Sequence, residues 1–592
     1  MALSRELRIA AHRAALVLLG AGAALGLWLL TDIWAEPGLP PALYLALFTF
    51  LAVQSSVALA LAGPIPIPRA LTGALVSALP ITALVSLAGQ RNTVATDLLD
   101  DPVMLTVAAM LVLFSTPFLS VWIVERRNWR RYEALFETAW TITMRYAVAW
   151  GFVAVFWLVA YLSNELLALV DIDIVDLVLR TDWVRFALTG AVLGLGLAVV
   201  YELRETVSPF LFLRLLRLLV PVVLAVVTVF LVAAPLRGLS RLFGEFSSAG
   251  LLMGAAIVSI TLISTALDRS RAEEVSTPGL RAATRMLALI LPLLTGLAVW
   301  AVALRVRQYG WTPDRVLAAG VALFLLAYGI GYCGAVLGRR GWTGRIRAVN
   351  VAMALAVIGA SALWMTPLLN AYRIATASQI GRFESGRATL DQLPLWELAH
   401  DWGKAGQAGL ARLEAMTGHP DHAELVQRIA TVRTRANPFQ YEQAIAGRSA
   451  PHRAVELAAL MAVRPEGAAL APEVFADLPS FRLDQWLEGC QRPLPDGRPG
   501  CVLVRGAFAP VGAAELQGIV LHLDAAGGAR ANFLLLRDGA PPVVREVYDP
   551  VGDTWPVLPA EVVAEALEGG FEIRPSGGNA LWIGGAVLEP GN

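Results

Sequence analysis

The chain has 592 residues, of which 57% are hydrophobic and only 16% are charged, with 47 basic and 47 acidic side chains. Soluble domains carry about a quarter charged residues, so a single globular core is excluded, and the low charge excludes a disordered chain. The net charge of zero does not indicate a nucleic-acid partner, and three cysteines are too few for a disulfide scaffold. The composition predicts an integral membrane protein.

Long apolar runs fill the first 369 residues and are missing afterwards. A bilayer core of about 30 Å requires about 20 apolar residues per helix. This criterion predicts an all-α polytopic bundle of about eleven transmembrane helices. Ten to twelve are compatible with the sequence, because arginines interrupt the start of the seventh run. The spans are expected near residues 14–30, 41–62, 70–88, 103–124, 146–166, 184–202, 215–234, 249–267, 286–304, 316–337 and 348–369.

The distribution of arginine predicts the orientation of these spans. The N-terminus and the loops on its side carry 20 arginines, whereas the loops on the other side carry seven, together with acidic runs such as Asp97, Asp100 and Asp101. Positively charged loops stay in the cytoplasm, so the N-terminus is expected there. An odd number of spans then places the chain after residue 369 outside the cytoplasm.

The predicted spans contain almost no ionisable residue near the membrane centre, where such residues indicate function. The most polar interior stretch is Gln54-Ser55-Ser56 in the second span. It fits either a functional polar contact inside the membrane or an ordinary hydrogen bond between helices. Gly190 and Gly194, four residues apart in the sixth span, predict close packing against another helix.

The loop between the ninth and tenth spans carries three arginines on the side where arginine is scarce. Arg305, Arg307 and Arg315 surround Tyr309 there, and Arg373 follows the last span. Guanidinium groups bind phosphate and carboxylate through paired hydrogen bonds, so these residues are a candidate anion or headgroup site. The alternatives are anchoring at the membrane interface by aromatic and arginine side chains, or pairing with the acidic C-terminal part of the chain.

Two motifs flank the last two spans. Residues 305–315 follow the pattern Arg-x-x-x-Tyr-Gly-x-Thr-x-x-Arg, and residues 370–379 follow Asn-x-Tyr-Arg-Ile-x-x-x-Ser-Gln. In these motifs, and over about residues 1–420, the chain resembles the bacterial multipass membrane proteins of domain-of-unknown-function family 4153. The resemblance implies a fold and a location in the bacterial cytoplasmic membrane, and it implies no activity.

The chain after the last span carries a net charge of −7, against +7 for the part before it. A helical period predicts an amphipathic helical segment over residues 370–470. Short β runs predict a small β-rich module, either α+β or a β-sandwich, over residues 471–592. Cys490 and Cys501 bracket a Pro/Gly-rich turn and fit a disulfide, which would indicate an oxidising compartment. The alternative is two unrelated cysteines.

Catalytic motifs are missing from the sequence, which has no Gly-x-Ser-x-Gly, His-Glu-x-x-His or phosphate-binding loop pattern. Its six histidines are scattered, so no metal or cofactor is expected. The leading prediction is a non-enzymatic envelope protein with an extracytoplasmic, periplasmic tail. Membrane lipids and an envelope protein or lipid-linked ligand are its expected partners. The alternatives are a transporter or flippase for an anionic or lipid-linked compound, and a membrane transferase acting on lipid-linked glycans with Glu165, Asp171, Asp173 or Asp314 as a base.

Overall fold

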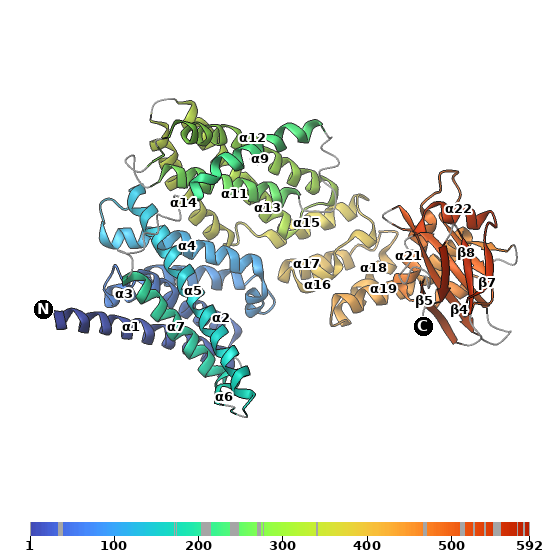
Figure 1. The fold of residues 1–592 in the computed structure, drawn as a ribbon, viewed down its shortest axis with the longest axis horizontal. Coiled ribbons are helices and arrows are strands. Elements are labelled where there is room, and N and C mark those ends of the chain that lie inside the picture. Colours follow the sequence, from blue (N-terminus) through green and yellow to red (C-terminus); the bar gives the residue numbers. More distant parts are fainter. Residues whose placement is uncertain are drawn as a thin grey trace. The chain divides into compact units, whose positions relative to one another are not determined.

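In a computed structural model the chain divides into two compact units, residues 1–422 and 423–592, and each is described by itself. Figure 1 shows the helices of the first unit in blue to yellow and the sheet of the second in red. The structure describes residues 2–33, 39–170, 172, 174–202, 215–236, 248–268, 274–275, 277–338, 341–465, 471–508, 516–524, 527–537, 540–548, 558–576, 578–583 and 586–590.

Ten helices among the described residues are long and apolar enough to cross a membrane. The multi-pass helical architecture predicted from composition is thereby confirmed. A short helix, α6 (Ile174–Arg180), connects the fifth of them to the sixth. The ten are α1 (Ala2–Trp28), α2 (Pro41–Leu61), α3 (Ile67–Gly89), α4 (Pro102–Val124), α5 (Tyr132–Ala168), α7 (Asp182–Glu202), α11 (Ser248–Leu267), α12 (Pro278–Tyr309), α13 (Pro313–Leu337) and α14 (Trp342–Trp364).

The seventh predicted span falls on a shorter helix. Helix α9 (Val220–Leu236) has 17 residues and follows a single 3-10 turn, η4 (Arg217–Leu219). Four of its valines are exposed to more than half of their area, at 57%, 63%, 68% and 61% for Val222, Val226, Val229 and Val232. An apolar surface of this kind suits contact with lipid.

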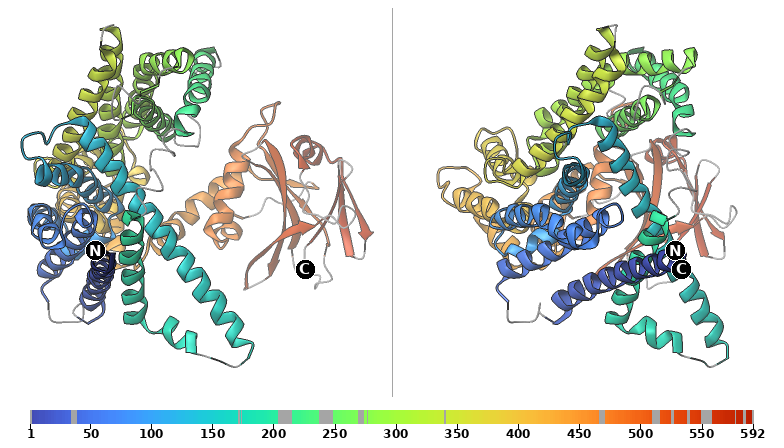
Figure 2. Two further views of the ribbon diagram at one scale, coloured as in Figure 1. Left: turned by 60° about the vertical axis from the view of Figure 1, so that its left-hand side comes forward. Right: turned by 90° about the vertical axis from the view of Figure 1, so that its left-hand side faces the viewer.

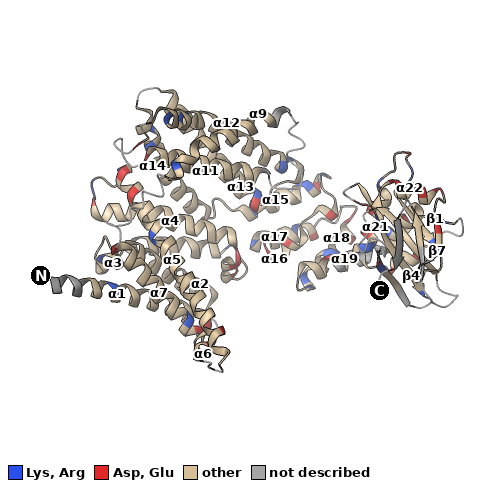
Figure 3. Cartoon of the chain, in the orientation of Figure 1, with Lys and Arg blue, Asp and Glu red and all other residues tan. Residues whose placement is uncertain are grey.

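The long helices pack around two separate hydrophobic cores. Helices α1 to α5 and α7 contribute to the first core, and α9 and α11 to α14 build the second. Figure 2 shows the second group, in green, beside the first, in blue to teal. Helix α4 packs against α14 and so connects the two groups. Charged residues occur mostly near helix ends and in connections, and the helix lengths between them are largely uncharged (Figure 3).

Helices α1 and α7 approach each other through glycine. A Cβ atom at Gly190 would overlap the carbonyl oxygen of Gly20, and one at Gly194 would overlap that of Leu16. Any larger residue at these positions would force the two helices apart, as expected for small residues at membrane helix contacts.

Short helices follow α14 within the first unit. Helix α15 (Ala371–Glu384) begins at Asn370, whose side chain accepts a hydrogen bond from the Arg373 backbone N–H at 3.3 Å, and it packs against α13. Helices α16 (Leu395–His400) and α17 (Gly403–Glu414) come next. The short helical turns of this unit are η1 (Leu29–Ile33), η2 (Ala95–Asp100) and η5 (Leu390–Gln392).

The second unit is an α+β module, so the helical stretch expected over residues 370–470 is shared between the two units. Its described strands form one nine-stranded sheet in the order β1-β2-β3-β4-β5-β9-β8-β7, with β6 beside β4. Strands β1 and β2 are parallel, and the other pairs are antiparallel. The helices are α18 (His422–Thr434), α19 (Pro438–Leu460), α20 (Glu473–Ala476), α21 (Ser480–Gln491) and α22 (Glu561–Leu567). The strands are β1 (Ala462–Arg464), β2 (Cys501–Arg505), β3 (Leu516–Leu523), β4 (Gly528–Arg537), β5 (Ala540–Tyr548), β6 (Leu558–Pro559), β7 (Glu572–Ser576), β8 (Gly578–Ile583) and β9 (Ala586–Pro590).

Both faces of this sheet are covered by helices. Successive residues of a strand point to opposite faces, and β2 is buried on both. Val502 and Val504 lie in the core that includes α22, whereas Cys501 and Leu503 lie in the core that includes α19 and α21. A sheet covered on two faces explains why the strands of this module read as continuous apolar runs.

Candidate functional site

The motif loop between α12 and α13 is held by α15. Gln379 donates from Nε2 to the carbonyl oxygens of Tyr309 at 3.0 Å and Trp311 at 2.8 Å, and the Trp311 N–H donates to Ser378 Oγ at 3.0 Å. Gly310 has a φ of 76°, a value that favours glycine, and a Cβ there would press on Gln379. The two motifs that carry the family resemblance therefore meet as a docking contact.

Two of the candidate anion-site arginines take part in the same contact. Arg315 donates from Nη1 to the carbonyl oxygen of Gly310 at 2.9 Å. The guanidinium carbons of Arg305 and Arg315 lie 5.8 Å and 5.4 Å from the centre of the Tyr309 ring. Arg307 and Arg373 are exposed and form no ion pair with described residues. The structure thus gathers Arg305, Tyr309 and Arg315, and the anion site stays a prediction.

A cavity of about 480 Å³ lies near this loop, where the ends of several helices meet. Six carboxylates line it, contributed by η2, by the starts of α4 and α13, and by α16 and the residue after it. Arg91 is the one arginine of the lining, which also includes Trp364, Tyr372, His400 and Trp402. The carboxylates are Asp97, Asp100, Asp101, Asp314, Glu397 and Asp401.

Two of these carboxylates have structural partners. Asp97 accepts a hydrogen bond from the Val94 backbone N–H at 3.2 Å. Asp101 is the N-cap of α4, where its Oδ1 accepts a hydrogen bond from the Val103 N–H at 2.9 Å. Its other carboxylate oxygen accepts a hydrogen bond from the Tyr372 hydroxyl. Burial raises the pKa of Tyr372, and the hydrogen bond to Asp101 raises it further. Asp101 therefore fixes both the start of α4 and the position of α15.

The other four carboxylates, Asp100, Asp314, Glu397 and Asp401, make no side-chain hydrogen bond or ion pair with the residues that the structure describes. Burial raises the pKa of Asp401, while the nearby His400 lowers it. A cavity surrounded by unpaired carboxylates attracts positive charge, because its walls focus a field of one sign.

Arg91 lies in the wall of the cavity and is only 8% exposed. Its Nη2 donates to the Trp364 carbonyl oxygen at 2.6 Å and the Leu369 carbonyl oxygen at 3.4 Å, which caps the end of α14. Its Nε and Nη1, like the indole N–H of Trp364, have no hydrogen-bond partner among the described residues. Burial lowers the pKa of Arg91, and Tyr372 and Asp101 partly oppose that effect.

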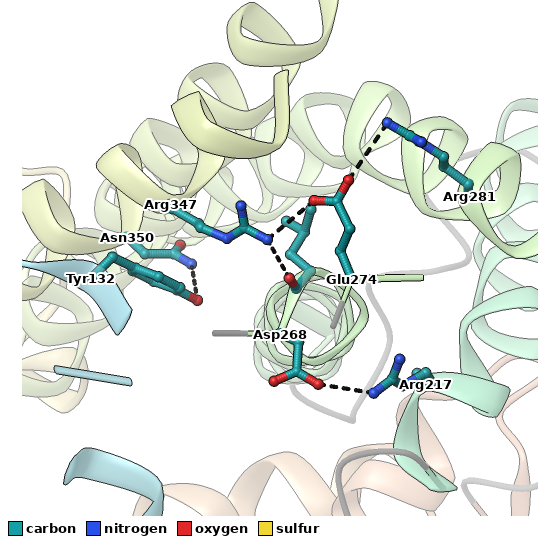
Figure 4. A network of polar contacts seen from close by, with 8 residues as sticks. Tyr132, Arg217, Asp268, Glu274, Arg281, Arg347 and Asn350 are labelled. Carbon is teal, nitrogen blue, oxygen red and sulfur yellow. Dashed lines mark hydrogen bonds and ion pairs between the residues drawn. The ribbon is translucent and has the colours of Figure 1, made fainter. Parts of the chain in front are cut away.

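A second polar region joins the opposite ends of the helices (Figure 4). Arg217 donates from Nη2 to Asp268 Oδ2 at 2.9 Å, which links the turn before α9 to the end of α11. Arg347, at the start of α14, donates to the Leu267 carbonyl oxygen at 2.5 Å and to Glu274 Oε2 at 3.1 Å. Each of these buried charges has a partner of opposite charge or a backbone carbonyl, so removing one partner would leave a poorly compensated charge at the helix ends.

Neutral side chains extend this region toward the interior of the second core. Asn350 donates from Nδ2 to Ser264 Oγ at 3.2 Å and to the Tyr132 hydroxyl at 3.4 Å, and its Oδ1 accepts from the Tyr332 hydroxyl. Four helices, α5, α11, α13 and α14, are joined by these contacts. Sequence reasoning missed this cluster, because its members are isolated polar residues on four different helices.

The polar stretch Gln54-Ser55-Ser56 in the second span makes hydrogen bonds within its own helix and one to a neighbouring helix. Ser55 donates to the carbonyl oxygen of Leu51 at 2.7 Å and Ser56 to that of Ala52 at 2.7 Å, both within α2. Gln54 donates to the Leu71 carbonyl oxygen of α3 at 2.8 Å, a hydrogen bond between neighbouring helices.

In the second unit Cys490 and Cys501 form a disulfide with a Cα–Cα distance of 4.7 Å, which connects the end of α21 to β2. No group of three or more His, Cys, Asp or Glu side chains in the described parts of the chain is arranged to hold a metal ion.

Comparisons with known proteins identify no relative. No family model, curated protein or solved structure matches the chain. Membership of family 4153 therefore stays a prediction, and functional arguments depend on the geometry described above.

Proposed function

We propose that the chain is a bacterial cytoplasmic-membrane protein of the family 4153 type, with eleven crossings, a cytoplasmic N-terminus and an extracytoplasmic C-terminal unit. We further propose that it acts by binding rather than by catalysis. The observation that carries the binding role is the cavity with its four unpaired carboxylates at the end of the helices.

Contacts between distant parts of the chain support a crossing by α9. Arg91 touches the Trp364 carbonyl oxygen, and between these residues lie seven of the ten long helices. Seven crossings would leave the two residues on opposite faces of a membrane, whereas α9 as an eighth returns them to one face. The helix and its preceding turn, 20 residues, extend about 30 Å at about 1.5 Å per residue, enough to span the apolar core.

The arginine distribution supports a cytoplasmic N-terminus. Eleven crossings then put the cavity, α15 and everything after it on the outer side. The described residues after Trp364 include no further candidate span. The disulfide between Cys490 and Cys501 agrees with an oxidising compartment.

The second unit offers a surface for a partner. Phe439 and Phe481 are each 66% exposed, and Val455 is 55% exposed. They lie on α19 and α21, which pack against each other. A continuous patch of exposed apolar side chains is typical of protein contact sites, and Val455 and Phe481 lie on neighbouring helices, whereas Phe439 lies at the other end of α19. We infer that this surface meets an envelope protein.

A transferase acting on lipid-linked glycans is the second candidate, favoured by the carboxylates of the cavity, among them Asp314. Of the other expected bases, Glu165 is not part of the cavity lining, and Asp171 and Asp173 lie outside the described residues. A transporter or flippase of anionic compounds is less favoured, because the cavity is acidic and Arg315 is bonded to the loop backbone.

Photo-crosslinking in cells tests the proposed binding role. A photoreactive amino acid replaces Phe481 or Phe439 in the full chain, and Arg127, in a predicted cytoplasmic loop, serves as the matched position. Crosslinks from Phe481 to an extracytoplasmic protein or a lipid-linked molecule, identified by mass spectrometry and lacking at Arg127, would support the proposal. Crosslinks from Phe481 to cytoplasmic proteins alone would contradict it.

A further inference from the structure

We propose that the starts of α12 and α14 bind the phosphate of an anionic phospholipid, whose acyl chains lie along the exposed face of α12. The site consists of Arg281 and Arg285, which lie over the ring of Trp342. This inference goes beyond the proposed function, because it names a ligand at the end of α14 opposite to the acidic cavity. Only the assignment of the site to the cytoplasmic leaflet rests on the proposed topology.

One aromatic ring holds the two arginines together. The guanidinium carbons of Arg281 and Arg285 lie 5.9 Å and 5.1 Å from the centre of the Trp342 ring. Trp342 is buried, so its ring is a fixed support, and cation–π attraction keeps both guanidinium groups near it. Guanidinium groups match the geometry of a phosphate, and a pair that is already positioned loses less conformational freedom when it binds one.

The described residues compensate the charge of this pair only in part. Arg281 and Arg285 are four residues apart on α12, a spacing at which like charges repel each other. Arg281 lies 3.6 Å from Glu274, but the same carboxylate lies 3.1 Å from Arg347, as Figure 4 shows. Arg285 makes no ion pair with described residues, and it is exposed, so a ligand can reach it. A phosphate beside the two groups would supply the missing negative charge.

Two helix starts meet at the same place. Helix α12 begins after Thr277 and α14 after Gly341, and neither start is capped by a side-chain hydrogen bond. Arg281 of α12 and Trp342 of α14 line one recess, so the two starts lie side by side. The positive end of each helix dipole favours an anion, which adds to the charge of the arginines.

The exposed face of α12 indicates that the anion belongs to a lipid. Met286, Leu293 and Trp300 are exposed and follow one another at intervals of seven residues, which places them on one face of the helix. Exposed Arg307 continues this interval, and Arg285 precedes Met286. Arg285 and Arg307 are 22 residues apart, about 33 Å along a helix, and the apolar core of a bilayer is about 30 Å thick. Arg285 therefore lies at the level of lipid phosphates, and the apolar face lies at the level of acyl chains.

Lipid binding is measured on the full chain in a neutral detergent by native mass spectrometry. Dimyristoyl phosphatidylglycerol and dimyristoyl phosphatidylcholine are the matched probes, because they share chains and phosphodiester but the choline ammonium is repelled by the arginine pair. We expect phosphatidylglycerol to bind saturably and at least about tenfold more tightly than phosphatidylcholine. Glycerol 3-phosphate, a phosphate without acyl chains, is expected not to displace the bound lipid at equal concentration.

Hydrogen exchange locates the bound lipid in the wild-type protein. Phosphatidylglycerol should slow the exchange of backbone amides at the starts of α12 and α14, and phosphatidylcholine at the same concentration should not. This measurement requires no variant, so it tests the site even if a substitution prevents folding.

Variants test the arginine pair. Arg285→Gln should weaken phosphatidylglycerol binding about tenfold and leave phosphatidylcholine binding unchanged. Arg285→Lys, which keeps the charge but loses the paired donors, should weaken it less. Arg126→Gln is the control, because Arg126 is also exposed and lies 5.5 Å from the ring centre of Trp122, where it is the one arginine that stacks among the described residues. Thermal unfolding without lipid identifies the variants that fold properly.

Three results would overturn the inference: equal binding of the two lipids, unchanged exchange at both helix starts, or equal losses in Arg285→Gln and Arg126→Gln. Displacement by glycerol 3-phosphate at equal concentration would show that the ligand is a soluble phosphate and not a lipid. Both faces of the protein are accessible in detergent, so a failure here leaves the proposed orientation and envelope contact intact, and failed crosslinking leaves this result intact.

Discussion

The Arg217 guanidinium lies 2.9 Å from the Asp268 carboxylate, so the turn before α9 and the end of α11 meet as a buried ion pair. The side chains are 13% and 4% exposed. Arg217 precedes α9 and Asp268 follows α11. The two residues can meet only if α9 and α11 run in opposite directions, so that the start of one lies beside the end of the other. The pair therefore supports a crossing by α9 in the same way as the contact between Arg91 and Trp364 does.

Asp268→Asn should destabilise the protein by about 3 kcal/mol, because it removes the carboxylate charge that pairs with the buried Arg217 guanidinium. Asparagine tolerates the positive φ of 52° at this position, so the backbone should be unaffected. Asp176→Asn removes an exposed ion pair with Arg180 and should cost less than about 1 kcal/mol. Thermal unfolding in detergent measures both. Equal effects of the two variants would contradict a structural role of the buried pair.

Gln379→Leu should loosen the docking of α15 on the motif loop. The variant takes the Gln379 donor away from both carbonyl oxygens. The Tyr309 oxygen keeps a hydrogen bond from Arg315 Nη1 at 3.4 Å, and the part-buried Trp311 oxygen loses its donor at a cost of about 1–3 kcal/mol. Faster hydrogen exchange in α15 and lower thermal stability are the expected results. Gln308→Leu alters an exposed side chain of the same loop and is the control. Unchanged exchange in Gln379→Leu would show that other contacts hold α15.

The sequence predicted the helices well because length and hydropathy are local properties. It did not predict which arginines are available to a ligand. Arg91 caps the end of α14, Arg145 donates to the Ala62 carbonyl oxygen at the end of α2 at 2.8 Å, and Arg347 caps α11. Arg315 does the same for α12. In the sequence, an arginine whose guanidinium caps a helix end cannot be told from one whose guanidinium faces solvent.

Only part of the acidic lining of the cavity could be recognised from the sequence. Asp97, Asp100 and Asp101 stood out as an acidic run, but Glu397 and Asp401 follow almost 300 residues later and have no local pattern. Their only signal is that they follow the last predicted span. Tertiary packing decides which distant helix ends come together, and the hydrophobic periodicity of the sequence does not predict that packing.

Asp401→Asn should raise the melting temperature of the unliganded protein at pH 7. Burial raises the Asp401 pKa above its usual 3.8, so the charged form is disfavoured in the folded state and its cost is present once the pH rises through this titration. The gain should shrink as the pH falls through the titration of the wild-type carboxyl. Glu165→Gln should show no gain. A lower melting temperature at pH 7 would mean that the Asp401 charge has a stabilising partner.

The second unit should lose stability as the pH falls from 7 to 5. His522 on β3 is 1% exposed, and burial lowers its pKa below the usual 6.5. Hydrogen bonds to Leu523 and Asn532 partly oppose that effect, and Arg482 and Arg530 lower the pKa further. The unfolded chain therefore binds a proton first, and the free energy of unfolding falls by up to about 1.4 kcal/mol per pH unit. Hydrogen exchange of β3 in the full chain measures this slope.

His522→Gln should flatten the pH slope, whereas His452→Gln, at an exposed position of α19, should leave it unchanged. A wild-type slope that persists in His522→Gln would assign the pH dependence to another group.

The most direct test of the proposed topology is labelling of single cysteines in spheroplasts with a membrane-impermeant maleimide. A Cys333→Ala background with the disulfide intact carries Val94→Cys, Arg127→Cys or Glu442→Cys, one at a time. We predict labelling of Val94→Cys and Glu442→Cys in intact spheroplasts, and labelling of Arg127→Cys only after lysis. If Glu442→Cys reacts only after lysis, the number of crossings is even, and the C-terminal unit is cytoplasmic.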